Sequence, residues 1–253
     1  MVTDRKQREK KLHQRLAHEY DERREGTKTG RYYSKEWLRY MIKKAKVSEG
    51  STVLDIGCGT GILYEVLREE GLDCKYIGAD LSPEMISVGK KRYPSIDLRI
   101  MDSEKLDFPD KSVDFIFMKA VLHHLPNPVK ALSEMKRVAK KTVIVSEPLN
   151  NILTELPRYL LKKLTNHFDE DHTHFSSKEM KNMLAKTHIK NAKVYYFGYL
   201  AYPWGFTDIL PGTKFLPLFI LKGLFKLDLL LEYVPLLSRL SWQIIVVCDF
   251  RKE

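Results

Sequence analysis

Cysteine is scarce in this chain. Of its 253 residues only three are cysteines, Cys58, Cys74 and Cys248, and no two of them form a C-x-x-C pair. The spacing predicts neither a zinc site nor a disulfide framework, so we expect no bound metal ion. So small a number of thiols fits a reducing, cytoplasmic setting.

Long apolar runs are absent as well. The first 25 residues are too highly charged to hold the apolar core of a signal peptide. The longest apolar stretch, near residues 215–221, is interrupted by Pro217 and ended by Lys222. A membrane span needs ~18–20 apolar residues, so the sequence predicts none. With 43% hydrophobic and 30% charged residues, the composition is typical of a globular chain.

Acidic residues are outnumbered, mainly near the start of the chain. The formal net charge is +10, and residues 1–50 hold 15 lysines and arginines against 8 acidic residues. A basic segment can meet nucleic acid or an anionic membrane surface, and a solvated helix has the same composition. Residues 4–25, with Leu12 and Leu16 one turn apart, predict a surface helix.

Short apolar runs alternate with helical segments from residue 52 onward. Strands are predicted at 52–56, 75–79, 97–101, 113–119, 142–146, 193–197 and 243–250. Helices are predicted at 34–46, 62–70, 82–92, 128–139, 150–166 and 176–187, the first starting at Ser34 and the last opening with a Ser176–Glu179 capping box. This alternation indicates an α/β fold with a mostly parallel seven-stranded sheet and helices on both faces.

Three alternate glycines follow the first predicted strand. Residues 53–61 read VLDIGCGTG, so a strand runs through a tight turn straight into a helix. Glycine lets a ligand lie against the backbone there. The spacing is G-x-G-x-G, and not the G-x-G-x-x-G of dinucleotide sites, which disfavours an NAD-dependent oxidoreductase. An acid inside the strand, Asp55, opposes a phosphate and suits a ligand with a cationic amino acid portion.

This run resembles the first motif of class I S-adenosylmethionine-dependent methyltransferases, close to the small-molecule group called type 11. The resemblance covers about residues 48–148, and the rest of the chain more weakly. It implies a Rossmann-like methyltransferase fold, S-adenosyl-L-methionine as cofactor and methyl transfer as the activity. It also implies that the glycine loop binds the cofactor through Asp55, Gly57, Cys58, Gly59 and Gly61.

The ends of the next two strands carry acids. The number of residues between the glycines and Asp80 is typical of a carboxylate that accepts hydrogen bonds from both ribose hydroxyls. We therefore expect Asp80 and Leu81 to contact the cofactor. Asp80 could instead cap the next helix, but Ser82 before Pro83 already suits that role. The resemblance implies that Asp102 binds the adenine amino group.

Three further cofactor contacts rest on the resemblance alone. The backbone amide of Ser103 would meet the adenine ring; the alternative for this stretch is an ordinary turn. Lys119 and Ala120 end the fourth strand and would face the sulfonium. Lys119 stands where the family more often has small or polar residues, so either its side chain points outward or its backbone lines the cofactor.

One aromatic and three histidines complete the candidates. Tyr20 resembles the family's N-terminal tyrosine that folds over the cofactor; it could equally be an aromatic on an amphipathic helix. Methyl transfer from a sulfonium needs alignment and, for some acceptors, a base. His124, His172 and His174 are the candidate catalytic residues. The polar loop around the last two has no standard metal-ligand spacing.

The resemblance predicts a domain division and an acceptor class. Residues 1–47 would be a helical extension capping a methyltransferase domain at 48–253, with acceptor-side helices at 149–190 and an apolar helical insertion at 203–240. That insertion could bury the sheet, cover an apolar acceptor or touch a membrane peripherally. A small, lipid-like acceptor is the leading interpretation. The alternatives are an RNA methyltransferase using the basic N-terminal segment, and a cofactor-binding partner protein without catalysis.

Overall fold

A computed structural model describes residues 26–151, 154–155, 174–205, 211–234, 237 and 240–251. They form one seven-stranded sheet in the order β3-β2-β1-β4-β5-β7-β6. β1 through β5 pair in parallel, and β7 lies antiparallel between β5 and β6. The strands are β1 (Thr52–Ile56), β2 (Lys75–Asp80), β3 (Asp97–Ile100), β4 (Val113–Lys119), β5 (Ala139–Pro148), β6 (Ala192–Phe197) and β7 (Gln243–Asp249). The predicted α/β fold is confirmed.

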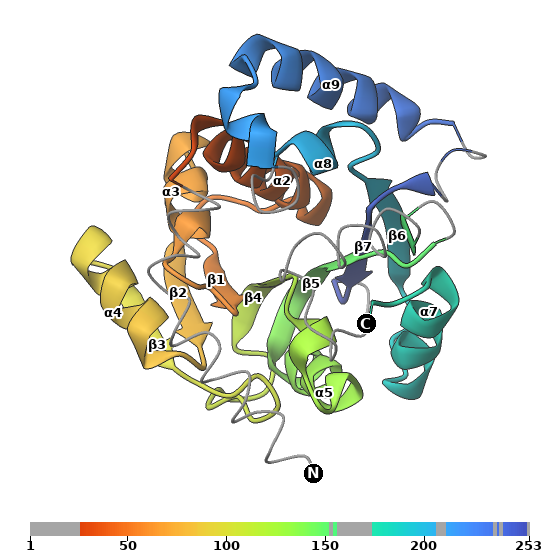
Figure 1. Ribbon diagram of the computed structural model, residues 1–253. Helices are drawn as coiled ribbons and strands as arrows, with labels where there is room; N and C mark the ends of the chain where they lie inside the picture. Colours follow the sequence, from red (N-terminus) through yellow and green to blue (C-terminus); the bar gives the residue numbers. More distant parts are fainter. Residues whose placement is uncertain are drawn as a thin grey trace.

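Helices cover both faces of this sheet (Figure 1). One face packs against α2 (Lys28–Ala45), α3 (Ile62–Glu69), α4 (Pro83–Arg92), α8 (Ala201–Gly205) and α9 (Leu218–Leu231). The other packs against α5 (Pro128–Val138) and α7 (Ser177–Lys186). The central strands are buried on both faces, which is why they read as continuous apolar runs in the sequence.

Caps account for two of the predicted helix starts. The Ser82 hydroxyl accepts a hydrogen bond from Met85 N at 3.2 Å, with Pro83 in the first turn of α4. Ser176 and Glu179 form the predicted capping box of α7: Glu179 N donates to Ser176 Oγ at 3.2 Å and Ser176 N donates to Glu179 Oε2 at 2.8 Å.

The predicted start of the first described helix was wrong. α2 begins at Lys28 and is capped by Thr27, whose Oγ1 accepts from Gly30 N at 3.1 Å. Ser34 lies inside the helix and is buried. The reason is tertiary: Tyr33, one turn before Trp37, is completely buried against aromatic rings at 5.9–6.3 Å, so packing overrides the weak local helix signal of residues 28–33.

The apolar insertion is mostly helical in the part that the structure describes. It comprises the end of α8, a 3-10 turn η2 (Pro211–Phe215) and α9. The helix predicted at 4–25 lies outside the described residues, as does most of the one predicted at 150–166. None of the described helices is long and apolar enough to cross a membrane.

The strand order reverses between β1 and β4. β1 connects outward to β2 and β3, whereas β4 leads to the other half of the sheet. In open α/β sheets the chain leaves a crevice beyond the carboxyl ends of the strands at such a switch point, and ligands bind there.

Candidate functional site

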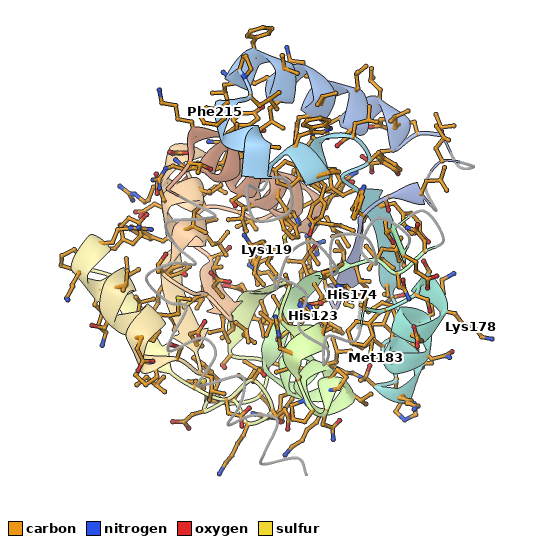
Figure 2. The ribbon with its side chains drawn as sticks, in the orientation of Figure 1. Lys119, His123, His174, Lys178, Met183 and Phe215 are labelled. Carbon is orange, nitrogen blue, oxygen red and sulfur yellow. The ribbon has the colours of Figure 1, made fainter. Side chains whose placement is uncertain are left out.

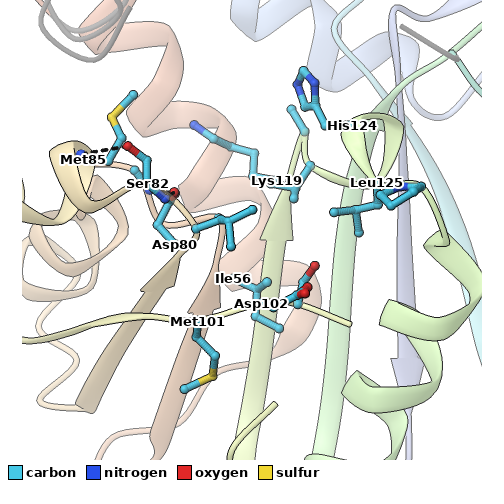
Figure 3. Close-up of a pocket in the computed structure, with 16 residues that line it drawn as sticks. Ile56, Asp80, Ser82, Met85, Met101, Asp102, Lys119, His124 and Leu125 are labelled. Atoms are coloured by element: carbon cyan, nitrogen blue, oxygen red, sulfur yellow. Dashed lines mark hydrogen bonds between the residues drawn. The ribbon is translucent and has the colours of Figure 1, made fainter. Parts of the chain in front are cut away.

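A pocket opens at this switch point. Its empty space, which includes open solvent, is roughly 930 Å³. The segments after β1, β2, β3 and β4 line it (Figure 3): Ile56, Gly57, Gly59, Asp80, Leu81, Ser82, Met85, Met101, Asp102, Ser103, Lys119, Ala120, Val121, His124, Leu125 and Pro126.

Glycine is required at the floor of the pocket. Gly57 has a φ of +69°, and a Cβ there would lie 2.2 Å from Cγ2 of Val121. Its backbone N donates to Ala79 O at 2.7 Å, which ties the loop to β2. Gly59 has a φ of +54° and open space where a side chain would stand. The loop therefore presents bare backbone to whatever occupies the pocket.

Asp80 is held in a fixed orientation at the end of β2. Its Oδ2 accepts from Gly59 N and its Oδ1 from Ser82 N, both at 2.9 Å. Each carboxylate oxygen keeps a further lone pair for a ligand. The helix-capping alternative is excluded by Ser82, which fills that role itself.

Asp102 and Ser103 line the pocket beyond the end of β3. Asp102 Oδ1 accepts from Glu104 N at 2.9 Å, so the side chain also closes a local turn. Ser103 is buried. Both residues line the pocket together with Met101, whose thioether side chain contributes an apolar surface.

Three predicted cofactor residues do not line this pocket. Asp55 of β1, and Cys58 and Gly61 of the glycine loop, are absent from its lining. Asp55 is buried, and its Oδ2 accepts from the Tyr76 hydroxyl at 2.9 Å. Along a strand successive side chains alternate faces, so the neighbour of pocket-lining Ile56 points away from the pocket.

Burial raises the pKa of Asp55 to about 7. The Tyr76 hydrogen bond and the positive charge of Lys119 oppose this shift, and the charge of Asp80 adds to it. A cation placed near the loop therefore favours the ionised form of Asp55.

The Lys119 side chain turns toward the site. Its Nζ lies 5.0 Å from the centre of the Trp37 ring. Figure 3 shows the Lys119 side chain extending toward Asp80 and Ser82, at the end of β2. Trp37 is itself fixed, because its Nε1 donates to Ser146 Oγ at 2.9 Å. Of the two alternatives for Lys119, the side chain pointing outward is excluded.

Backbone strain marks the residue that follows Lys119. Ala120 has a φ of +56°, which is rare for a residue other than glycine, and its N donates to Ser146 O at 2.7 Å. Ala120 and Val121 line the pocket at this point. Strain of this kind is often retained where the chain must aim a loop at a ligand.

A buried carboxylate that sequence reasoning missed holds the next loop. Glu147 is 0% exposed. Its Oε1 accepts from Val121 N at 2.9 Å and Leu122 N at 2.8 Å, and its Oε2 lies 2.6 Å from His123 Nδ1. Burial raises the pKa of Glu147 to about 7, against the effect of the amide hydrogen bonds. An acid at the end of an apolar strand was the available signal, since buried acids are rare unless paired.

The histidines gather beside this carboxylate. The ring of His123 lies 4.0 Å from that of His124 and stacks on that of His174 at 6.0 Å (Figure 2). His124 lines the pocket, whereas His174 does not. His123 carries no signal of its own in the sequence. His172 and Tyr20 lie outside the described residues.

The described part of the chain offers no cluster of metal ligands. Within those residues, no group of three or more His, Cys, Asp or Glu side chains is arranged to hold a metal ion.

Comparison with known proteins agrees with the site. The methyltransferase domain family of type 11 matches residues 54–145. A demethylmenaquinone methyltransferase from Renibacterium salmoninarum is 34% identical over 140 residues, 52% of this chain and 57% of the relative. One from Lysinibacillus sphaericus is 33% identical over 130 residues, 49% of this chain and 54% of the relative. The chain thus spans about half the length of the curated relatives it matches.

Solved structures share the fold. An S-adenosylmethionine-dependent methyltransferase from Archaeoglobus fulgidus has a TM-score of 0.60 at 20% identity, covering 91% of this chain and 97% of its own. The methyltransferase in a complex with the Trm112 methyltransferase activator of Haloferax volcanii has a TM-score of 0.64 at 19% identity, covering 93% and 96%. The family match, the glycine loop and the switch-point pocket agree, and residues 54–145 belong to a class I S-adenosylmethionine-dependent methyltransferase domain of the type 11 family.

Proposed function

We propose that the chain transfers the methyl group of S-adenosyl-L-methionine to a small apolar acceptor with an electron-rich, quinone-type ring. The observation that carries the proposal is the mixed lining of the pocket, in which carboxylates follow β2 and β3 and apolar side chains follow β4. The names of the relatives, demethylmenaquinone methyltransferases, support a quinone-like acceptor.

The polar half of the pocket suits the cofactor. Asp80 can accept the ribose hydroxyls, and Asp102 can accept from the adenine amino group. The open space at Gly59 lets the amino acid portion lie against the backbone, and we expect Lys119 to attract its carboxylate. When bound, the cofactor supplies an electrophilic methyl group on a positively charged sulfur.

The other half suits an apolar ring. Val121, Leu125 and Pro126 line it, with His124 as the one ionisable side chain among them. Because the Nδ1 atom of His124 is buried, we expect its Nε2 to face the acceptor. In the reaction the new bond forms between the acceptor nucleophile and the methyl carbon, the carbon–sulfur pair returns to sulfur, and the acceptor's proton passes to His124 or to water.

The test is an incubation with methyl-labelled cofactor and cell extract separated into lipid, aqueous small-molecule, RNA and protein pools. We expect label in the lipid pool from the wild-type chain, and much less from Asp80→Asn when the cofactor concentration is at or below the wild-type Kd. Asp97→Asn, which removes an exposed carboxylate on β3, is the matched control and should label like the wild type. Label confined to RNA, or cofactor binding without label in any pool, would overturn the proposal.

A further inference from the structure

An exposed apolar face runs along α9. Phe219 is 74% exposed, Ile220 39%, Leu227 49% and Leu230 65%. Their spacings of one, seven and three residues place them on one side of a helix with 3.6 residues per turn. Figure 1 shows α9 at the outer edge of the molecule. We call these four side chains the α9 apolar face.

Exposed apolar side chains continue beyond both ends of the helix. Phe215 precedes α9 and is 79% exposed; Tyr233 and Val234 follow it and are 78% and 41% exposed. Figure 2 places Phe215 at the rim of the molecule. Soluble proteins rarely leave so many large apolar side chains together in water without a binding role.

The orientation of α9 is fixed from its opposite side. Leu221 and Phe225 are buried, and the Phe225 ring lies 5.6 Å from that of Phe197. The carboxylate of Asp228 accepts from Leu200 N at 2.7 Å and Ala201 N at 3.0 Å, which joins α9 to the start of α8. The helix therefore cannot rotate its apolar face inward without breaking these contacts.

The charges around this face have one sign. Lys222 and Lys226 are exposed and lie one turn apart at its edge. The only acidic residue of α9, Asp228, is buried. Glu232, just beyond the helix, pairs with Lys44 at 2.5 Å. A symmetric contact between two copies of this helix would bring lysines toward lysines, whereas anionic headgroups would complement them.

The length of α9 determines whether it could span a bilayer or would lie at its surface. It has 14 residues, fewer than the ~20 that a membrane span needs. An amphipathic helix of this kind lies in the plane of the interface, with its apolar side chains among the acyl chains and its lysines among the headgroups.

We propose that the α9 apolar face, with Lys222 and Lys226, docks the protein on the surface of an anionic lipid bilayer. This inference does not depend on the proposed acceptor, because vesicle binding needs neither cofactor nor acceptor. A quinone-type substrate would be collected from the same bilayer.

The test is co-sedimentation of the full chain with vesicles of phosphatidylcholine alone and of phosphatidylcholine mixed with phosphatidylglycerol. We expect binding to the mixed vesicles that falls as salt is raised. The double substitution Phe219→Ser with Leu230→Ser should weaken partitioning by about tenfold or more, because it removes two of the largest inserting side chains. Ile100→Ser, which removes another exposed apolar side chain, on β3, should bind like the wild type.

A charge test separates specific docking from general attraction. Lys222→Glu with Lys226→Glu should abolish the preference for anionic vesicles. Lys90→Glu with Lys91→Glu makes the same change in net charge on α4 and should leave the preference intact. Equal loss in both double variants, or no binding of the wild type to mixed vesicles, contradicts the proposal. Sedimentation analysis could instead show a dimer that the Phe219 and Leu230 substitutions dissociate. The α9 apolar face would then bind a second copy of the chain, and the proposal would be overturned.

Discussion

His123 Nδ1 and Glu147 Oε2 lie 2.6 Å apart in the interior of the domain, between the loop after β4 and the end of β5. The same carboxylate accepts from the amides of Val121 and Leu122. One buried side chain therefore holds the loop that lines the pocket after β4 and carries His124.

Replacing this carboxylate should impair turnover more than cofactor binding. Glu147→Ala leaves two buried amides without acceptors, at about 1–3 kcal/mol each. We expect a lower melting temperature and a reduced kcat, with the cofactor Kd little changed and partial recovery in Glu147→Gln. Glu179→Ala, which removes the capping box of α7, should lower stability without lowering kcat. A Glu147→Ala enzyme with normal kcat would show that the loop keeps its position without it.

Gly57→Ala should abolish cofactor binding. The added methyl would lie 2.2 Å from Val121 Cγ2, and the φ of +69° costs a further ~1–2 kcal/mol for any residue with a Cβ. Gly71→Ala is the matched control, because Gly71 has a φ of +72° and open space around it at the end of α3. Calorimetric titration with the cofactor should show binding to Gly71→Ala alone. Equal loss of binding in both variants would attribute the effect to backbone strain.

Asp80→Asn should weaken cofactor binding about tenfold, which corresponds to one lost charge-assisted hydrogen bond. The amide that replaces one carboxylate oxygen can no longer accept from both Gly59 N and Ser82 N. The same titration measures the change. An unaltered cofactor Kd would show that Asp80 does not bind the ribose.

His124→Ala should lower kcat by about 10²-fold or more if the imidazole takes the acceptor's proton. Cofactor binding should persist. The same substitution at His174, which does not line the pocket, should have a smaller effect. If the kcat of His124→Ala equalled that of the wild type, the acceptor's proton would pass to water and not to His124.

The stability of the protein should fall as pH rises from about 4 to about 7, in part through Asp55. Its pKa rises from an ordinary 3.8 to about 7 on folding, so over this interval the folded state binds more protons than the unfolded state. The stability that this group adds is complete below its unfolded pKa and is lost as pH passes its folded pKa. Asp55→Asn keeps an acceptor for the Tyr76 hydroxyl and should flatten the slope, as measured by urea unfolding across this pH interval. An unchanged slope would show that the carboxyl does not titrate there.

The sequence predicted the sheet and part of the pocket lining for a physical reason. Buried parallel strands are short apolar runs, and ligands lie where such runs end, so Asp80 could be placed by its position at a strand end. Asp102 was placed by the family resemblance. Gly57 and Gly59 followed from the same pattern.

The remaining features depend on contacts distant in sequence. Ser34 had the features of a helix start, but the aromatic packing of Tyr33 extends α2 back to Lys28. Asp55 belongs to the glycine motif, yet strand alternation turns it toward Tyr76. Glu147 gave no periodic signal, because its partners lie 24–26 residues earlier in the chain.

The most direct test of the central claim is mass spectrometry of a reduced demethylated quinone incubated with the purified chain and S-adenosyl-L-methionine in lipid vesicles. The account predicts a product in which one hydrogen is replaced by a methyl group, formed by the wild type and by Asp97→Asn but not by Gly57→Ala. Tight cofactor binding with no methylated quinone, and methyl transfer to an RNA or a water-soluble acceptor instead, would contradict it.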